Sequence, residues 1–400
     1  MDNTVNTNRD VTYYDNCDYQ RGLSPLSDAN ALYRAFRNSM KGSAWKPSVQ
    51  RFEVNFLSEI IELQDEILEG KYSPSQTNVF TIRERGKTRI IKGEKIRDRC
   101  VKHVLCDDVL MPLIKPRLIY DNAASLKNKG VSFTRKRLVC HLQRYYREYG
   151  NEGYVLLTDF SKFYDNILHE KLKQVLLRDS YDETAKRIID IILEREQVDV
   201  SFLSDSEYLN CMNVLFDSLE YAKIPDELKT GQKFMHKHMD IGDQLAQIAG
   251  ISYPMEIDNY IKIVCGIKYY ARYMDDSYII HPSKEYLNEL KFNLMKRCAD
   301  IGITMHERKT RICKISDYWR FLQIQYSLTD TGRIIRKINP VTLTRMRRKM
   351  KKIYDITTDE VFSQFFFSWY RNYRKYMSHK QKQNMMQLYN DLRRIKYVQD

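Results

Sequence analysis

The sequence predicts an α+β fold, and three observations support this prediction. Apolar segments rich in β-branched and aromatic residues lie at 78–92, 153–159, 268–280 and 311–336, and these are predicted strands. Between them, apolar residues recur every three or four positions, which is the period of an α-helix. With 400 residues, the chain is long enough for two or three subdomains around a sizeable core.

The predicted elements follow from residue patterns along the chain. The first 25 residues lack periodicity and are predicted to form an irregular arm. Residues 78–92 alternate around Gly86, which predicts a β-hairpin, and 201–235 are predicted to form a mixed insertion. Helices are predicted, in chain order, from residue 27, over 52–68, 97–113, 166–200, 244–264 and 285–301, and from 342 onward.

The charge balance favours a polyanionic partner. Lys plus Arg number 66 against 52 Asp plus Glu, so the net charge is +14 and the pI about 9.2. Nucleic acid is the leading candidate for such a partner. An anionic membrane is the alternative, but we find no apolar run long enough to span a bilayer and no signal pattern at the N-terminus. We therefore expect a cytoplasmic protein without a membrane partner.

The cysteines indicate neither a disulfide framework nor a zinc site. None of the eight forms a Cys-x-x-Cys pair, and no histidines accompany them at zinc-finger spacing. We expect reduced and mostly buried thiols.

Two acidic segments are candidates for a catalytic or metal-binding site. Residues 273–276 read Tyr-Met-Asp-Asp between two predicted strands, which places Asp275 and Asp276 at a hairpin turn. Asp159 ends the strand over 153–159, where its carboxylate would lie at the sheet rim beside that turn. A fold keeps like charges together mainly when a cation neutralises them, and two divalent metals roughly 4 Å apart are the usual device for phosphoryl transfer. A solvated turn and a helix N-cap are the structural alternatives.

Residues 158–167 (Thr-Asp-Phe-Ser-Lys-Phe-Tyr-Asp-Asn-Ile), together with the acidic hairpin, resemble the catalytic motifs of prokaryotic reverse transcriptases. These are the group-II-intron, retron and diversity-generating enzymes. The resemblance spans roughly 50–350, with its motifs in the family order. It implies RNA-directed DNA polymerase activity with two Mg²⁺ or Mn²⁺ ions, held by Asp159, Asp275 and Asp276. Lys309, in a Lys-Thr motif, would protonate or neutralise pyrophosphate.

The resemblance also implies a right-hand polymerase, with fingers, a palm built on an antiparallel sheet and a helical thumb. We expect an N-terminal arm at 1–45, fingers at 46–150, a palm at 151–335 with an insertion at about 176–235, and a helical thumb at 336–400. We find no RNase H, integrase or nuclease segment after the thumb.

Four residues would contact the nucleotide if the resemblance holds. Tyr164 stands where an aromatic ring excludes a 2′-hydroxyl, which favours deoxynucleotides. Gln247 would lie over the incoming nucleotide, in a motif where Ala246 replaces the family serine. Lys87 and Arg89, in the basic hairpin, would bind the triphosphate.

Further residues would bind the template and primer. The resemblance points to Arg97 and Arg99 at the start of a predicted helix and to Gly242, which precedes Gln247. It also points to Phe-Leu-Gln at 321–323, where the family's primer-grip motif ends in Gly. A basic helix in the thumb would lie along the duplex. These residues are Arg97, Arg99, Gly242, Phe321, Leu322, Arg345, Arg348 and Lys352.

The expected partners are an RNA template, a DNA or RNA primer, the DNA product and deoxynucleotides; a homo-oligomer or a partner protein stays open. A dedicated non-coding RNA in an antiviral defence system is the favoured setting, and a diversity-generating retroelement is the alternative. A template-independent or protein-primed polymerase and a non-catalytic RNA-binding protein are the other hypotheses. The three aspartates argue against the last of these.

Overall fold

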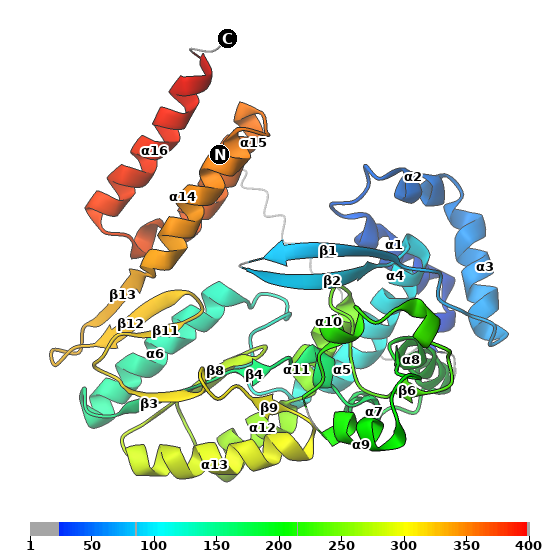
Figure 1. Cartoon of the computed structure of the whole chain (residues 1–400), viewed down its shortest axis with the longest axis horizontal. Coiled ribbons are helices and arrows are strands. Elements are labelled where there is room, and N and C mark those ends of the chain that lie inside the picture. Colours follow the sequence, from blue (N-terminus) through cyan, green and yellow to red (C-terminus); the bar gives the residue numbers. More distant parts are fainter. Residues whose placement is uncertain (1–23, 85, 214, 398–400) are drawn as a thin grey trace, which may run out of the picture.

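The computed structural model describes residues 24–84, 86–213 and 215–397. Helices alternate with small antiparallel sheets, which confirms the predicted α+β class. Figure 1 shows a helical part built from the N-terminal third, a central sheet, and a helical C-terminal part on the other side of the molecule. The predicted irregular arm at 1–25 lies almost wholly outside the described residues.

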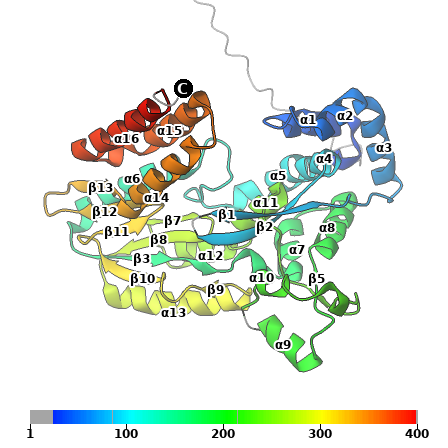
Figure 2. The same ribbon diagram turned by 45° about the horizontal axis from the view of Figure 1, so that its top comes forward.

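The N-terminal part is a group of helices with a projecting hairpin. It comprises α1 (Ala29–Met40), α2 (Pro47–Val54), α3 (Phe56–Leu68), β1 (Asn78–Glu84), β2 (Lys87–Gly93), α4 (Ile96–Val104) and α5 (Met111–Ile114). The expected single helix over 52–68 was wrong, because the chain breaks at Asn55, whose ψ of 18° is not helical. The hairpin points from these helices toward the central sheet (Figures 1 and 2).

The central sheet has the strand order β10-β3-β8-β7, with every pair antiparallel. Its strands are β3 (Tyr154–Thr158), β7 (Tyr270–Tyr273), β8 (Asp276–His281) and β10 (Arg311–Lys314). Both faces are buried, because alternate residues of each strand enter different hydrophobic cores. Leu156 and Ile279 join the core shared with the N-terminal helices, whereas Val155 and Tyr278 join the core shared with the C-terminal helices.

The second core connects the sheet to the C-terminal helices. It takes Leu138, Leu142 and Tyr145 from α6 (Val131–Tyr149). A second sheet of β11 (Trp319–Phe321), β12 (Ile324–Leu328) and β13 (Ile334–Ile338) leads directly into this part of the chain. The bundle itself comprises α14 (Pro340–Tyr354), α15 (Asp359–Tyr373) and α16 (His379–Tyr397).

The segment between β3 and β7 is mixed, as expected for its middle part. The helical prediction over 166–200 resolves into α7 (His169–Leu177) and α8 (Glu183–Arg195), followed by β5 (Val198–Asp199). The insertion holds α9 (Asp205–Asn213), α10 (Ser218–Tyr221) and β6 (Phe234–Met235) around a small core of its own. The remaining helices are α11 (Gln244–Ser252), α12 (Met255–Asn259) and α13 (Lys284–Asp300).

The cysteines and the helix hydropathy bear on two further expectations. The described cysteines are all free, but Cys100, Cys106 and Cys298 alone are fully buried, so the expectation of mostly buried thiols was wrong. Cys211, Cys265 and Cys313 are partly buried and pack at the edges of cores. Within the described ranges, we find no helix whose length and apolarity would let it cross a membrane.

Gly153, just before β3, provides a stability test of how tightly the sheet packs against α6. Its φ is +138°, and an added Cβ would overlap the buried Tyr145 hydroxyl and lie 3.2 Å from the His281 carbonyl oxygen. Gly150 has φ +66° with open space around it, so Gly150→Ala is the control and costs about 1–3 kcal/mol from backbone strain alone. We expect Gly153→Ala to lower the free energy of unfolding by about 2 kcal/mol more than the control, measured by urea denaturation. Equal losses would contradict this packing.

Candidate active site

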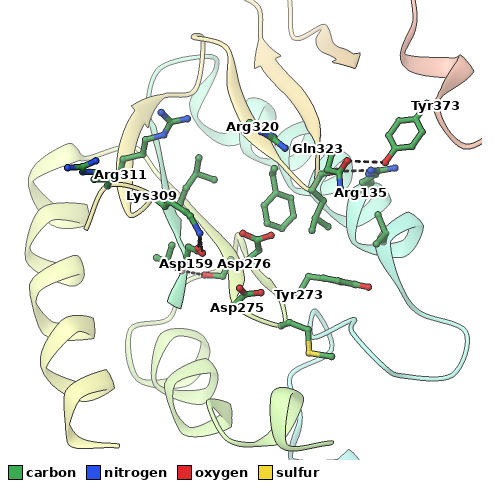
Figure 3. Close-up of a pocket in the computed structure, with 18 residues that line it drawn as sticks. Arg135, Asp159, Tyr273, Asp275, Asp276, Lys309, Arg311, Arg320, Gln323 and Tyr373 are labelled. Carbon is green, nitrogen blue, oxygen red and sulfur yellow. Dashed lines mark hydrogen bonds and ion pairs between the residues drawn. The ribbon is translucent and has the colours of Figure 1, made fainter. Parts of the chain in front are cut away.

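A cleft of about 930 Å³ lies where the central sheet meets β11 with the turn after it, α6 and the end of α15. The three aspartates singled out from the sequence, Asp159, Asp275 and Asp276, all line it. Figure 3 shows the three carboxylates gathered on one side of the cleft, although they come from segments more than a hundred residues apart.

Strand pairing brings these carboxylates together. Thr158 at the end of β3 is the register partner of Ser277 in β8, and their hydroxyl oxygens lie 2.5 Å apart. The next residue along β3 is Asp159, and the residue before Ser277 is Asp276. Because the strands are antiparallel, Asp159 leaves the sheet at the same edge where Asp276 enters it.

The turn that carries Asp275 is held from beneath by Arg272. Met274 has a left-handed φ of 54°, and its carbonyl oxygen accepts a hydrogen bond of 3.0 Å from Arg272 Nη1. The same guanidinium donates to the carbonyl oxygens of Gly250 and Ile251 and forms a bidentate ion pair with Asp258, in which neither side chain is more than 1% exposed. Non-glycine residues keep such strained backbone where surrounding contacts impose it, often at functional sites.

The negative charges of the three carboxylates repel one another. Burial, and then the charges of Asp275 and Asp159, raise the pKa of Asp276 to about 7, although Lys309 and Arg320 act in the opposite direction. Lys309 Nζ lies 2.7 and 2.5 Å from the two carboxylate oxygens of Asp159, which is only 4% exposed. A cation among these oxygens would relieve the repulsion, and hard oxygen donors are the ligands that Mg²⁺ and Mn²⁺ prefer. The residues present therefore fit a divalent metal.

A tighter group of potential ligands lies elsewhere. Among the described residues, the ligand atoms of Glu196, His238 and Asp240 all lie within 4.8 Å of one another, a spacing that the three cleft aspartates do not reach. Basic side chains of the protein itself already pair with the carboxylates of this group. Lys92 pairs with Asp240 at 2.6 Å, and His238 lies between Asp165 and Asp240 at 3.1 Å from each. This arrangement is typical of a buried ion-pair network that ties β2 to the insertion.

Basic side chains surround the acidic centre, and the sequence analysis did not identify most of them. Arg308, Arg311, Arg320 and Arg135 line the cleft beside Lys309. Arg311 is the exposed first residue of β10, and Arg320 alternates with the buried Trp319 and Phe321 in β11. That alternation was the available signal, because a charged residue between two core residues of a strand faces away from the core. Cations around carboxylates suit a polyanion whose phosphates approach bound metal.

None of the predicted nucleotide contacts is among the described residues that line this cleft. The Tyr164 hydroxyl lies 3.9 Å from Met274 Sδ and packs at Gly250, where an added Cβ would lie 2.5 Å from it. Burial and Asp275 raise the pKa of Tyr164 to about 12. Gln247 is an exposed residue of α11. Arg89 lies on β2, and the side chain of Lys87 lies outside the described residues.

The other predicted contacts lie in separate parts of the structure. Phe321 and Leu322 line the cleft, whereas Gly242 is exposed and packs near Ile91 of β2. The basic residues of α14 are exposed along one face of the bundle: Arg345, Arg348 and Lys352.

Arg97 and Arg99 are not brought to the cleft. Arg97 pairs with Glu66 and lies over the Tyr72 ring at 5.6 Å, and Arg99 donates to the Ser39 carbonyl oxygen. Both side chains therefore hold N-terminal helices together. A basic helix start has the same sequence pattern whether its arginines meet phosphates or neighbouring helices.

Comparisons with known proteins find a distant likeness among solved structures. No family model and no curated protein matches the chain. Among solved structures, the chain is similar to telomerase from Candida albicans in complex with a TWJ fragment of telomeric RNA, with a TM-score of 0.42 and 11% identity. The match covers 82% of this chain and 59% of that chain, so this chain spans less than two thirds of the telomerase length. A similarity of this size leaves the function to be argued from the residues themselves.

Proposed function

We propose that this protein is an RNA-directed DNA polymerase of the right-hand type. The observation that carries the proposal is the meeting of Asp159, Asp275 and Asp276 on one side of a cleft ringed by basic side chains. Carboxylates alone would suit several hydrolases. Their combination with an adjacent basic helical bundle and a net charge of +14 favours a nucleic-acid substrate.

In this proposal the three aspartates hold two Mg²⁺ or Mn²⁺ ions. When bound, the ions lower the pKa of a primer 3′-hydroxyl and neutralise charge on the triphosphate. Arg308, Arg311 and Arg320 face the cleft, where they would stabilise phosphate charge. Lys309, whose Nζ contacts Asp159, would neutralise charge on the pyrophosphate.

Primer extension tests the proposal. Purified full-length protein would receive a heteropolymeric RNA with an annealed DNA primer, four deoxynucleotides and Mg²⁺ or Mn²⁺, and the products would be sequenced. A DNA complement of the RNA is the expected result. Homopolymer made equally well without RNA would instead support the template-independent hypothesis, and RNA binding without synthesis would support the non-catalytic one. The choice between antiviral defence and diversification stays a prediction from the sequence.

Sugar selection by Tyr164 gives a more specific prediction. Tyr164→Ala removes the ring that packs between Gly250 and Met274, so a ribonucleotide should enter more easily. We expect ribonucleotide use relative to deoxynucleotide use to rise about 10- to 100-fold, from the two kcat/KM values on one RNA template. Tyr181→Ala is the control, since that tyrosine is 95% exposed. An unchanged ratio in Tyr164→Ala would remove Tyr164 from the nucleotide site.

A further inference from the structure

Arg135 of α6 joins three elements at the wall of the cleft. Its Nη2 donates a hydrogen bond of 2.6 Å to the Leu322 carbonyl oxygen. Its guanidinium lies 5.5 Å from the ring centres of both Tyr373, the last residue of α15, and Tyr376 in the short helix that follows. Arg135 is 8% exposed, so these contacts form in a largely desolvated site, where a cation over aromatic rings interacts most strongly.

The turn that Arg135 contacts is backbone-strained. Leu322 and Gln323 link β11 to β12 as a two-residue turn, because Phe321 pairs with Ile324. Their φ values are +43° and +70°, and each left-handed non-glycine residue costs about 1–2 kcal/mol. The Tyr373 hydroxyl also donates to Gln323 Oε1 at 3.3 Å. The turn is therefore held from α6 through Arg135 and from α15 through Tyr373, as Figure 3 shows.

The Arg135 side chain is buried at the wall of the cleft. Its Nε is buried and has no hydrogen-bond partner among the groups that the structure describes. A buried donor left unsatisfied costs about 1–3 kcal/mol. Arg135, Gln323 and Tyr373 also line the same cleft as the three aspartates. The contacts of Arg135 and Tyr373 with the turn therefore lie at the wall of the proposed active site.

We propose that Arg135 is a positioning residue that couples the C-terminal helical bundle to the Leu322–Gln323 turn. A bundle that moves onto a primer–template duplex carries the end of α15 with it. Tyr373 and Tyr376 would then shift Arg135, and Arg135 would shift the turn that borders the primer end. Duplex binding and placement of the primer 3′-end thus become one event. This inference rests on the proposed polymerase function and adds to it the link between duplex grip and cleft.

The test compares arginine variants in the full-length protein. Arg135→Met keeps the length of the side chain but loses the charge and the planar fork, whereas Arg135→Lys keeps the charge alone. Labelled primer on RNA would be extended in the presence of excess unlabelled duplex, so that each product reports one binding event. We expect Arg135→Met to shorten the mean product about 5- to 50-fold, with Arg135→Lys between it and the wild type.

Two further variants separate coupling from general stability. Arg187→Met removes the same kind of bond, from Arg187 Nη2 to the Ile67 carbonyl oxygen at 2.5 Å, outside the cleft lining. It should leave product length unchanged even if it lowers the melting temperature. Tyr373→Leu should shorten products as Arg135→Met does, and the double variant should be no worse than the more defective single one, because both changes break one connection.

The outcomes distinguish the inference from the function it rests on. If the wild-type protein extends no primer, the polymerase proposal fails and the coupling fails with it. If the wild type extends primers but Arg135→Met and Tyr373→Leu give wild-type product lengths, only the coupling is overturned. If Arg135→Met does not fold, Arg135→Lys and Tyr373→Leu decide in the same way. Additive defects in the double variant would also overturn it.

Discussion

Asp275→Ala is expected to reduce primer extension by at least about a thousandfold and to leave RNA affinity unchanged or slightly higher. The carboxylate lies at the turn between β7 and β8 and lines the cleft with Asp159 and Asp276. Its loss removes a proposed metal ligand, whereas binding of RNA depends on basic surfaces. Deleting one acid near a phosphate backbone reduces repulsion, so affinity should not fall.

The measurement pairs single-turnover extension with RNA binding in the same buffer, across a titration of Mg²⁺ and Mn²⁺. Asp226→Ala is the matched control, because it makes the same change in net charge at a side chain that is 97% exposed. Wild-type rates in Asp275→Ala would refute the assignment of this carboxylate. A parallel loss of RNA binding would instead indicate that the substitution disturbs the fold.

Asp258→Ala is expected to lower the free energy of unfolding by about 3–5 kcal/mol. The reason is the charge that it leaves behind. Arg272 is 1% exposed and forms an ion pair with Asp258 at 2.7 Å. Removing the carboxylate buries an uncompensated guanidinium, and the Tyr270 hydroxyl also loses its 2.5 Å contact. Urea denaturation followed by circular dichroism measures the loss.

A double replacement separates stability from positioning of the turn. Asp258→Leu combined with Arg272→Met removes both charges and should recover part of the stability. It should nevertheless extend primers poorly, because Met274 loses the hydrogen bond that supports its left-handed backbone. Glu220→Ala is the stability control, since the Lys223–Glu220 pair is exposed and should contribute no more than about 0.5 kcal/mol. An unchanged unfolding free energy in Asp258→Ala would contradict the account.

Local pattern was sufficient for much of the fold. The hairpin around Gly86, the strand before Asp159 and the acidic hairpin each depend on neighbours a few residues away, and the structure has all three. The break at Asn55 was missed because Phe52 and Phe56 fit one helical stripe whether or not the helix between them is continuous. Periodicity reports which face is buried and not whether the axis bends.

The residues of the candidate site also differ in whether a local sequence pattern could identify them. The aspartates were recognisable because their chemistry is concentrated in two short motifs. Arg272 stood beside one motif, but its partner Asp258 lies on α12, and no local pattern links the two. Arg97 and Arg135 show the converse. Both are arginines in basic helical segments, yet one holds helices together and the other borders the cleft.

The sequence by itself therefore determined the α+β class, the strands that carry the three aspartates and the acidic residues that merit testing, whereas the helix α6 was not predicted. Only the tertiary structure decided which cations face those acids, what supports the acidic turn, and how the Leu322–Gln323 turn connects to α15. The physical reason is the distance along the sequence between the residues that interact. Secondary structure and turn chemistry arise from neighbours within a few residues, whereas ion pairs and cleft walls form between segments that only the packing of both cores brings into contact.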